Sequence, residues 1–259
     1  MIRPGNDKVR AENRRGPQAT GAARVPTSLA SAAGRSYTVT MTTYSLGQLT
    51  LSELEGLATV VDRGTVTEIW DEQRAGELGA REQLLLDELR GRLLSYKTQL
   101  VNEATIWARA IYPLLVLAER DNVRAFAGVP LAAKLPKGEL RGEVDGALAR
   151  MGIEGDAAPP YLLVVEAKRG VEGHDPVAQL LGGLLCAAVR NHAHRAKAEH
   201  VLYGVYTIAD VWTMVRVVVS GLDGEQPVIT TVSSREYTEK TEADVILRLL
   251  KGMVVELAS

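Results

Sequence analysis

The chain of 259 residues has a single cysteine and no long apolar run. One thiol, Cys186, excludes a disulfide framework within the chain and favours a reducing compartment. Cys186 lies inside an apolar helical pattern, so we expect it to be a packing residue. Apolar stretches such as 182–189 are far shorter than the roughly 18 residues that a membrane span needs. We therefore predict a cytoplasmic protein that does not act at a membrane.

Motifs of two common enzyme classes are also missing. The sequence has no Gly-x-x-x-x-Gly-Lys segment, so we do not expect the chain to translocate along nucleic acid by itself. No serine lies in a Gly-x-Ser-x-Gly elbow, which argues against a Ser-His-Asp hydrolase. His192 and His194 are a poor metal pair, because residues two apart on a helix do not share a face.

The charge balance also sets limits. The chain carries 30 basic and 32 acidic residues, a net charge of -2. This disfavours nucleic-acid binding, which requires local Lys and Arg, although the acidic residues of a metal site are offset when the metal binds. Two local basic clusters are present: Arg190, His192, His194, Arg195 and Lys197, and also Lys134, Lys137 and Arg141. The first fits a helix end that complements the helix dipole or a nucleic-acid contact; the second fits a solvated turn or a groove contact.

The first 99 residues differ from the rest. Residues 1–40 are rich in Arg, Ala, Gly and Ser without sustained periodicity, which predicts a disordered basic leader. It could be an arm for nucleic acid, an organelle leader or a dispensable extension before Met41. Residues 41–99 predict a helical extension, with a capping box at Thr50 and Glu53 before an apolar stripe that ends at Gly64. A second helix is expected over 81–96.

Residues 100–259 alternate between helical and strand patterns, which predicts an α/β fold with a mixed central sheet flanked by helices. A loop is expected over 152–160. The expected helices cover 102–119, kinked at Pro113, a segment that begins at Pro176 with Asp175 as N-cap, and 242–257. The expected strands cover 123–127, 129–135, 140–150, 162–165, 201–208, 211–219 and 227–232.

Charged residues follow one of these strands directly. Leu162 to Val165 is typical of a strand buried on both faces, and Glu166 and Lys168 come next. Because residues two apart in a strand share a face, both side chains point the same way while Ala167 points into the packing. With Asp145 on a neighbouring strand, two acids and one base can meet, as in metal sites that cleave phosphodiesters. The alternative is an ordinary ion pair at a strand end.

The ordered set of motifs resembles the PD-(D/E)XK nuclease superfamily over residues 100–220. It is most similar to the N-terminal nuclease domain of type I restriction motor subunits and to small stand-alone proteins of similar pattern. The matching residues are Asn102-Glu103, Asp145, Glu166-Ala167-Lys168, Gln179, Tyr203-Gly-Val-Tyr-Thr and Trp212. The chain departs from the pattern at Val144, where the motif has a proline that many members also lack, and at Gly183, where restriction relatives often have tyrosine.

The resemblance implies a restriction-endonuclease-like fold and a role for each residue. Asp145 and Glu166 are expected to bind Mg²⁺ or Mn²⁺, hard cations that favour carboxylate oxygen, with the Ala167 carbonyl as a third ligand. Glu103 would reach the site through a metal-bound water or a second ion, or it would only complement its helix dipole. Lys168 would act as a base or as a positive charge. Gln179 would touch the substrate or orient Lys168, or it is an exposed helix residue.

We therefore predict a metal-dependent endonuclease that acts on DNA, alone or as the cutting subunit of a larger assembly, with a partner subunit or as a homodimer. One alternative is a catalytically inactive nuclease fold that serves as a nucleic-acid-binding or scaffolding subunit. Another is a nuclease directed at RNA, which differs only in substrate.

Overall fold

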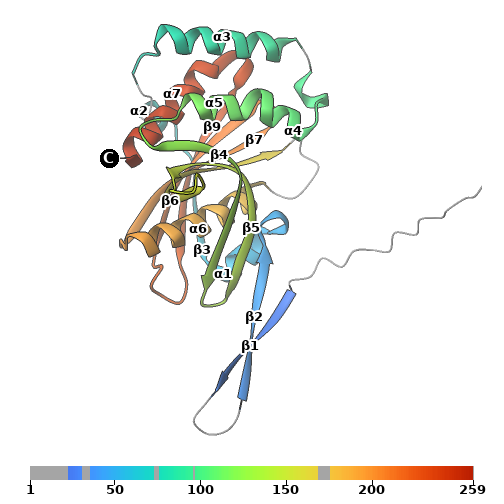
Figure 1. Cartoon of the computed structure of the whole chain (residues 1–259), viewed down its shortest axis with the longest axis vertical. Helices are drawn as coiled ribbons and strands as arrows, with labels where there is room; N and C mark the ends of the chain where they lie inside the picture. Colours follow the sequence, from blue (N-terminus) through green and yellow to red (C-terminus); the bar gives the residue numbers. More distant parts are fainter. Residues whose placement is uncertain (1–22, 31–35, 73–75, 96, 169–175, 259) are drawn as a thin grey trace, which may run out of the picture.

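A computed structural model describes residues 23–30, 36–72, 76–95, 97–168 and 176–258 (Figure 1). It confirms the mixed α/β class, because the described residues form a nine-stranded mixed sheet flanked by helices. The strands follow the order β1-β2-β5-β6-β7-β8-β9-β3, and β4 pairs with β5. Their bounds are β1 (Ala23–Ala30), β2 (Ser36–Ser45), β3 (Thr59–Thr65), β4 (Val123–Leu135), β5 (Gly138–Met151), β6 (Ala157–Lys168), β7 (Glu199–Ile208), β8 (Val211–Ser220) and β9 (Val228–Thr238).

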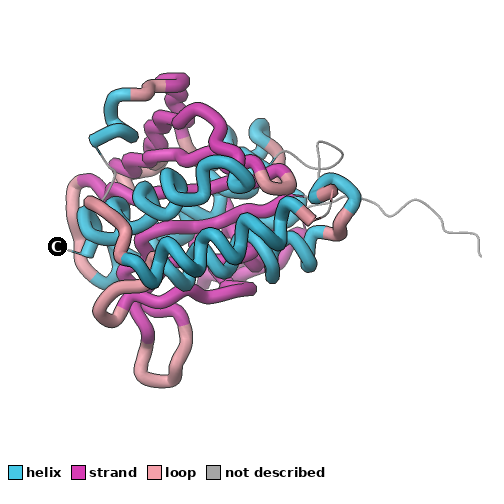
Figure 2. The backbone as a smooth tube through the Cα atoms, turned by 90° about the horizontal axis from the view of Figure 1, so that it is seen from above, coloured by secondary structure: helices cyan, strands magenta, loops and turns pink. Residues whose placement is uncertain are grey.

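The helices form one layer on each face of the sheet, and each layer has its own buried cluster (Figures 1 and 2). One layer holds α2 (Glu68–Glu72), α3 (Ala80–Leu94), α4 (Glu103–Ile106), the π-helical turn η3 (Trp107–Ile111), α5 (Tyr112–Leu117) and α7 (Glu239–Ala258). The other layer holds η1 (Leu46–Gln48), α1 (Leu51–Leu57) and α6 (Pro176–His194). A short turn, η2 (Thr98–Leu100), precedes α4. In the part of the chain that the structure describes, none of these helices has the length and apolarity of a membrane span.

The central strand β6 is buried on both faces, as its sequence predicted. Leu163 and Val165 pack in the cluster with α7, whereas Val164 packs in the cluster with α6. Cys186 is also fully buried, on α6, and burial raises the pKa of its thiol to about 12. It is the packing residue that the pattern indicated.

The strand β5 has a gap along one edge, and Asp145 lies in this gap. Residues 139–141 pair with β2 and residues 146–151 pair with β6, so the described register leaves 142–145 without a neighbouring strand on that edge. Side-chain alternation also slips here, because Val144 and Ala147 are three residues apart but pack in the same cluster. Gly128 lies opposite on β4 and has a φ of +59°, a conformation that glycine accepts readily.

Helix α6 lies against β5 and β6 without room for a side chain at Gly183. A Cβ atom built there would be 2.7 Å from Cγ1 of Val144 and 3.2 Å from Cγ1 of Val164. The two departures from the nuclease pattern, Val144 and Gly183, are therefore packed against each other. Position 183 faces the sheet, and its glycine permits the close approach of the helix.

Two predictions for the first 99 residues need correction. The helix expected up to Gly64 ends at Leu57, and β3 follows, paired in parallel with β9. Two adjacent β-branched residues, Val60 and Val61, favour a strand once β9 offers an edge, so tertiary pairing overrides the helical stripe. Residues 23–30 and 36–45 form an antiparallel hairpin and not a disordered leader. The rest of the predicted leader lies outside the described residues.

Smaller differences occur elsewhere. The expected kink near Pro113 takes the form of η3, in which the N–H of Tyr112 bonds to the carbonyl of Trp107; Pro113 has no N–H of its own to continue the α-helical pattern. Strand β6 begins at Ala157, inside the expected loop, because Ala157 and Ala158 pair with β5. The predicted N-cap Asp175 lies outside the described residues.

The packing of α6 leads to a first prediction. Gly183→Ala should lower the free energy of unfolding by about 1–3 kcal/mol, because the new methyl group overlaps the two valines. Gly91→Ala on α3 is the matched control, since nothing lies within 4 Å of its added Cβ. That variant should gain about 0.5–1 kcal/mol from helix propensity. Urea unfolding measures both, and equal stabilisation of the two variants would contradict the close packing of α6.

Candidate active site

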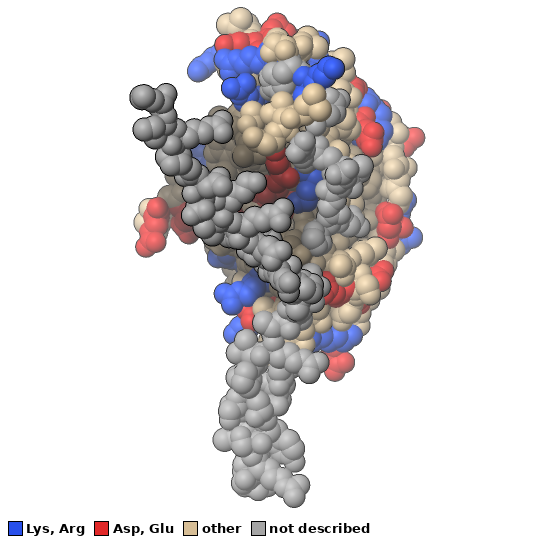
Figure 3. Space-filling model, turned by 90° about the vertical axis from the view of Figure 1, so that its right-hand side faces the viewer, with Lys and Arg blue, Asp and Glu red and all other residues tan. Residues whose placement is uncertain are grey.

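Asp145, Glu166 and Lys168, which the sequence predicts to be catalytic, converge where β6 ends. A carboxylate oxygen of Asp145, Oδ2, accepts a hydrogen bond of 2.6 Å from the backbone N–H of Ala167. The Lys168 ammonium donates to Oε1 of Glu166 at 2.6 Å. Both charged side chains of β6 lie on the face covered by α6, and Ala167 packs in the opposite cluster. In Figure 3 a hollow on this side of the molecule holds acidic and basic side chains next to each other.

Burial makes the charges at this corner unfavourable. Glu166 is only 6% exposed, and burial together with the nearby charge of Asp145 raises its pKa to about 7, although Lys168 opposes this. Burial also raises the pKa of Asp145, against the hydrogen bond from Ala167. Burial lowers the pKa of Lys168, but Glu166 and the other carboxylates outweigh it, so this pKa lies above its ordinary value. Lys168 is therefore protonated at neutral pH.

Glu103 stands at the edge of the same site. Its charge contributes to the raised pKa values of both Glu166 and Lys168, and its side chain is exposed. Asn102 caps this helix, because its side chain accepts a hydrogen bond of 2.8 Å from the N–H of Thr105. One turn after Glu103, the indole of Trp107 lies against Gly146, where a Cβ atom would overlap it. This contact places the start of α4 beside the gap in β5.

A buried polar cluster that the sequence did not reveal ties α4 to the end of β6. The N–H of Ala209, in the turn between β7 and β8, donates to the carbonyl of Lys168 at 2.8 Å. Its neighbour Asp210 accepts a hydrogen bond of 2.5 Å from the hydroxyl of Thr98, and Lys240 donates to the same hydroxyl at 2.8 Å. Thr98 begins η2, which leads directly into α4. The only sequence signal was the tight turn at Ala209-Asp210.

The same cluster contains a carboxylate with no exposed surface. Glu239 accepts a hydrogen bond of 2.9 Å from the indole N–H of Trp212, and its other oxygen has no partner among the described residues. Burial, with Asp210 nearby, raises the pKa of Glu239 to about 8. Two aromatic residues of the motif are thus parts of the core: Trp212 holds Glu239, and Tyr203 donates to Glu256 at 2.8 Å.

Gln179 is buried, and its amide nitrogen bonds to another group and not to Lys168. That nitrogen donates to the carbonyl of Gly47 at 2.7 Å, in the turn that follows β2. The amide oxygen has no partner within the described part of the chain, and the residue is 3% exposed. The alternative that Gln179 is merely an exposed helix residue is therefore wrong. It joins α6 to η1.

The residues at this corner fit a small divalent cation. Among the described residues, no group of three or more His, Cys, Asp or Glu side chains is arranged to hold a metal. Asp145 and Glu166 with the Ala167 carbonyl form a smaller set, which suits Mg²⁺ because this ion keeps several waters as ligands. Burial is the main cause of the raised pKa values of both carboxylates, and a bound cation would favour their ionised forms.

Comparison with known proteins assigns no family. No protein-family model matches the chain, and no curated protein is significantly similar to it in sequence. The geometry of the site and the motif resemblance are therefore the two indications of function.

The buried Glu239 leads to a pH-dependent prediction. Its folded pKa of about 8 lies above the ordinary value of 4.5, so the unfolded chain loses this proton at lower pH than the folded chain. The contribution of protonated Glu239 to the free energy of unfolding is therefore complete below pH 4.5 and is lost as the pH rises to about 8. Glu239→Gln removes this loss, which is on the order of a few kcal/mol.

Thermal unfolding of wild type and Glu239→Gln at pH 5 and pH 8 measures this effect. The variant's advantage in melting temperature should be larger at pH 8 than at pH 5. Glu236→Gln, at an exposed position of β9, is the control and should show no such change. An advantage that does not grow with pH would contradict the buried ionisation of Glu239.

Proposed function

We propose that the protein is a divalent-metal-dependent nuclease with a restriction-endonuclease-like fold, related to the PD-(D/E)XK superfamily and acting on DNA. The observation that carries this proposal is the convergence of Asp145, Glu166 and Lys168 at one partly buried corner. An ordinary ion pair at a strand end needs only Glu166 and Lys168. Asp145, whose carboxylate is held beside them by the N–H of Ala167, has no role in such a pair.

Asp145, Glu166 and the Ala167 carbonyl would hold Mg²⁺ or Mn²⁺, and Glu103 would contribute through a bound water. Such an ion polarises a phosphate oxygen and lowers the pKa of a bound water. The protein itself contributes the fixed positions of its oxygen ligands. Asp145 is fixed by Ala167, and the chain segment that carries Glu103 is anchored to the buried cluster around Asp210.

Lys168 supports the reaction through its positive charge. The neighbouring carboxylates raise its pKa above the ordinary value, which favours the protonated amine at neutral pH. A protonated amine next to a phosphate favours the extra negative charge that develops there in the transition state. Burial strengthens this effect, because less water screens the charge. Of the two roles that the sequence left open, the structure favours the electrostatic one.

A second candidate function is that of a catalytically inactive nuclease fold that serves as a scaffolding or nucleic-acid-binding subunit. Two observations that weaken the contact to nucleic acid support its scaffolding form: the net charge of the chain is -2, and Gly183 faces the sheet, so α6 lacks the tyrosine of restriction relatives as a contact to nucleic acid. A nuclease directed at RNA would use the same residues. A panel of substrates distinguishes these alternatives.

Cleavage by wild type and three variants tests the proposal. Asp145→Ala, Glu166→Ala and Lys168→Ala should each slow metal-dependent cleavage by roughly 10²-fold or more, because each removes transition-state stabilisation. Substrate binding should persist. The measurement is single-turnover cleavage of single- and double-stranded DNA and RNA with Mg²⁺, Mn²⁺ or EDTA. Glu236→Ala is the control and should cleave like wild type.

Calorimetric titration with Mn²⁺ gives a readout that does not depend on cleavage. Binding of the ion should be lost in Asp145→Ala and kept in Glu236→Ala. If wild type binds nucleic acid but cuts none of the four substrates with either metal, and all variants bind equally well, the non-catalytic function replaces the nuclease.

The electrostatic role of Lys168 makes a separate prediction. Lys168→Arg keeps a positive charge and should retain at least about tenfold more activity than Lys168→Met, which removes it. Single-turnover rates between pH 6 and 9 measure the difference. Equal inactivity of both variants, with a wild-type rate that rises as a lysine loses its proton, would show that Lys168 is the base instead.

A further inference from the structure

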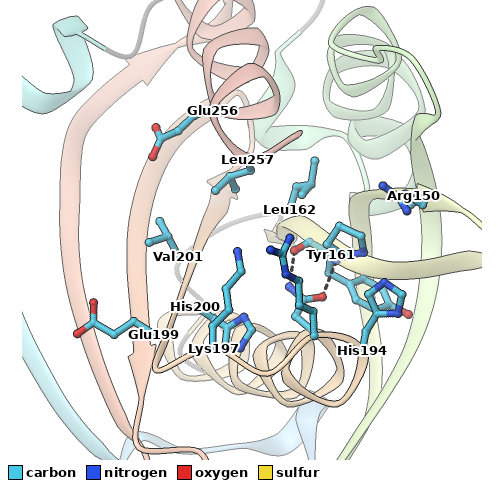
Figure 4. A pocket seen from close by; sticks show the side chains of 13 residues that line it. Arg150, Tyr161, Leu162, His194, Lys197, Glu199, His200, Val201, Glu256 and Leu257 are labelled. Carbon is cyan, nitrogen blue, oxygen red and sulfur yellow. Dashed lines mark hydrogen bonds between the residues drawn. The ribbon is translucent and has the colours of Figure 1, made fainter. Parts of the chain in front are cut away.

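A second concave site lies at the opposite end of β6 and α6 from the catalytic corner. It is a pocket of about 510 Å³ formed where β6 begins and where α6 and α7 end (Figure 4). Gln179 lies in the first turns of α6, whereas the pocket is lined by His194 at its other end. A helix of 19 residues is about 28 Å long at 1.5 Å per residue. The pocket is thus separate from the proposed nuclease site.

Three basic side chains line this pocket. Arg150 comes from the end of β5, and Arg195 and Lys197 come from the segment after α6. The carboxylates of Glu199 and Glu256 also line it, and in Figure 4 they lie away from Arg150 and His194. Tyr203 already donates a hydrogen bond to Glu256 at 2.8 Å. Three positive charges therefore line one cavity, and one of the two carboxylates beside them already accepts a hydrogen bond.

A helix dipole does not account for this arrangement. Basic residues at the end of α6 would complement its carbonyl groups, but Arg150 belongs to a strand and still lines the same cavity. Lys197 lies three residues past the last residue of the helix, His194. Charges from separate elements that converge on one cavity indicate a site for an anion.

The walls of the pocket are preformed. The side chain of Asn191 makes two hydrogen bonds to the backbone of Tyr161, accepting from its N–H at 2.7 Å and donating to its carbonyl at 2.8 Å. This pair fixes the end of α6 against the start of β6. His200 is buried beside the cavity, with Nε2 at 3.2 Å from Nδ1 of His192. A ligand would therefore need little reorganisation of these walls.

We propose that this pocket binds a nucleoside monophosphate. The phosphate lies against Arg150, Arg195 and Lys197, where guanidinium groups can donate paired hydrogen bonds to its oxygens. The apolar side chains of Leu162, Val201 and Leu257 line the same cavity and pack against the base. Glu199, across the cavity, accepts from ribose hydroxyls. The volume suits a ligand of this size. This inference does not depend on the proposed nuclease activity.

Calorimetric titration of the full chain with adenosine monophosphate tests the inference. We expect one site per chain. A double variant, Arg195→Gln with Lys197→Gln, should bind at least about tenfold more weakly, because two charge-assisted contacts are lost from exposed positions. Arg92→Gln is the matched control, since Arg92 is exposed on α3 and pairs with Glu88. It should bind within about twofold of wild type.

Further titrations separate the two halves of the ligand. Adenosine and inorganic phosphate should each bind at least about tenfold more weakly than adenosine monophosphate, because each lacks one set of contacts. Asp145→Ala should leave this binding unchanged, so failure of the nuclease proposal and failure of this one are distinguishable. Arg150→Gln provides a second variant if the double variant does not fold, which its thermal unfolding curve shows.

Four outcomes would overturn the proposal. They are no binding of the nucleotide at millimolar concentration, equal affinity of wild type and the pocket variants, binding of inorganic phosphate as tight as that of the nucleotide, and binding of adenosine as tight as that of the nucleotide. A single-stranded oligonucleotide that binds through Arg195 and Lys197 while the mononucleotide does not would show a nucleic-acid surface instead.

Discussion

The hydrogen bond from the N–H of Ala167 to the carboxylate of Asp145 is the interaction on which the site depends. The ladder between β5 and β6 ends at Gly146 and Val165, one residue before Asp145 and Glu166 would face each other. Beyond that point the N–H of Ala167 loses a backbone partner, and a buried N–H without a partner is strongly unfavourable. Asp145 provides the replacement at 2.6 Å. The end of the strand pairing therefore draws the aspartate beside Glu166 and Lys168.

The free energy of this arrangement is consistent with a functional site. Burial raises the pKa of Asp145 and of Glu166, so both carboxylates are held where ionisation is unfavourable. Glu239, near the same end of the sheet, shows the same effect. Groups whose ionisation opposes folding concentrate where function needs them. At this end of the sheet two such groups, Asp145 and Glu166, are part of the candidate site, and the third, Glu239, belongs to the cluster that anchors α4.

Helix α6 connects the two ends of the molecule that we assign to ligands. Its close packing at Gly183 fixes the helix against β5 and β6, so its first turns present Gln179 to η1 and its last residues form the wall of the second pocket. Residue 183 is a glycine that packs directly against Val144. Helix α6 therefore lies closer to the sheet than it could with a tyrosine at position 183. The divergence from the nuclease pattern thus has a packing consequence at both positions.

Local sequence patterns account for much of the fold and for part of the candidate site. The apolar run before Glu166 specified a strand buried on both faces, and the spacing of Glu166 and Lys168 placed both side chains on one face. These are local properties, because alternation along a strand is set by the backbone itself. Periodicity likewise identified α3 and α7, and the capping pattern at Thr50 and Glu53 identified the start of α1.

Which residues meet across the sheet depends on long-range pairing of the strands. The gap in β5 between β2 and β6 arises from pairing between segments about a hundred residues apart, which no local pattern records. For the same reason β3 was mistaken for helix, because its strand conformation depends on the edge of β9. The cluster of Thr98, Asp210 and Lys240, and the pocket at Arg150, join elements that are remote in sequence. Polar residues at such positions carry no periodic signal, so their partners appear only once the sheet is assembled.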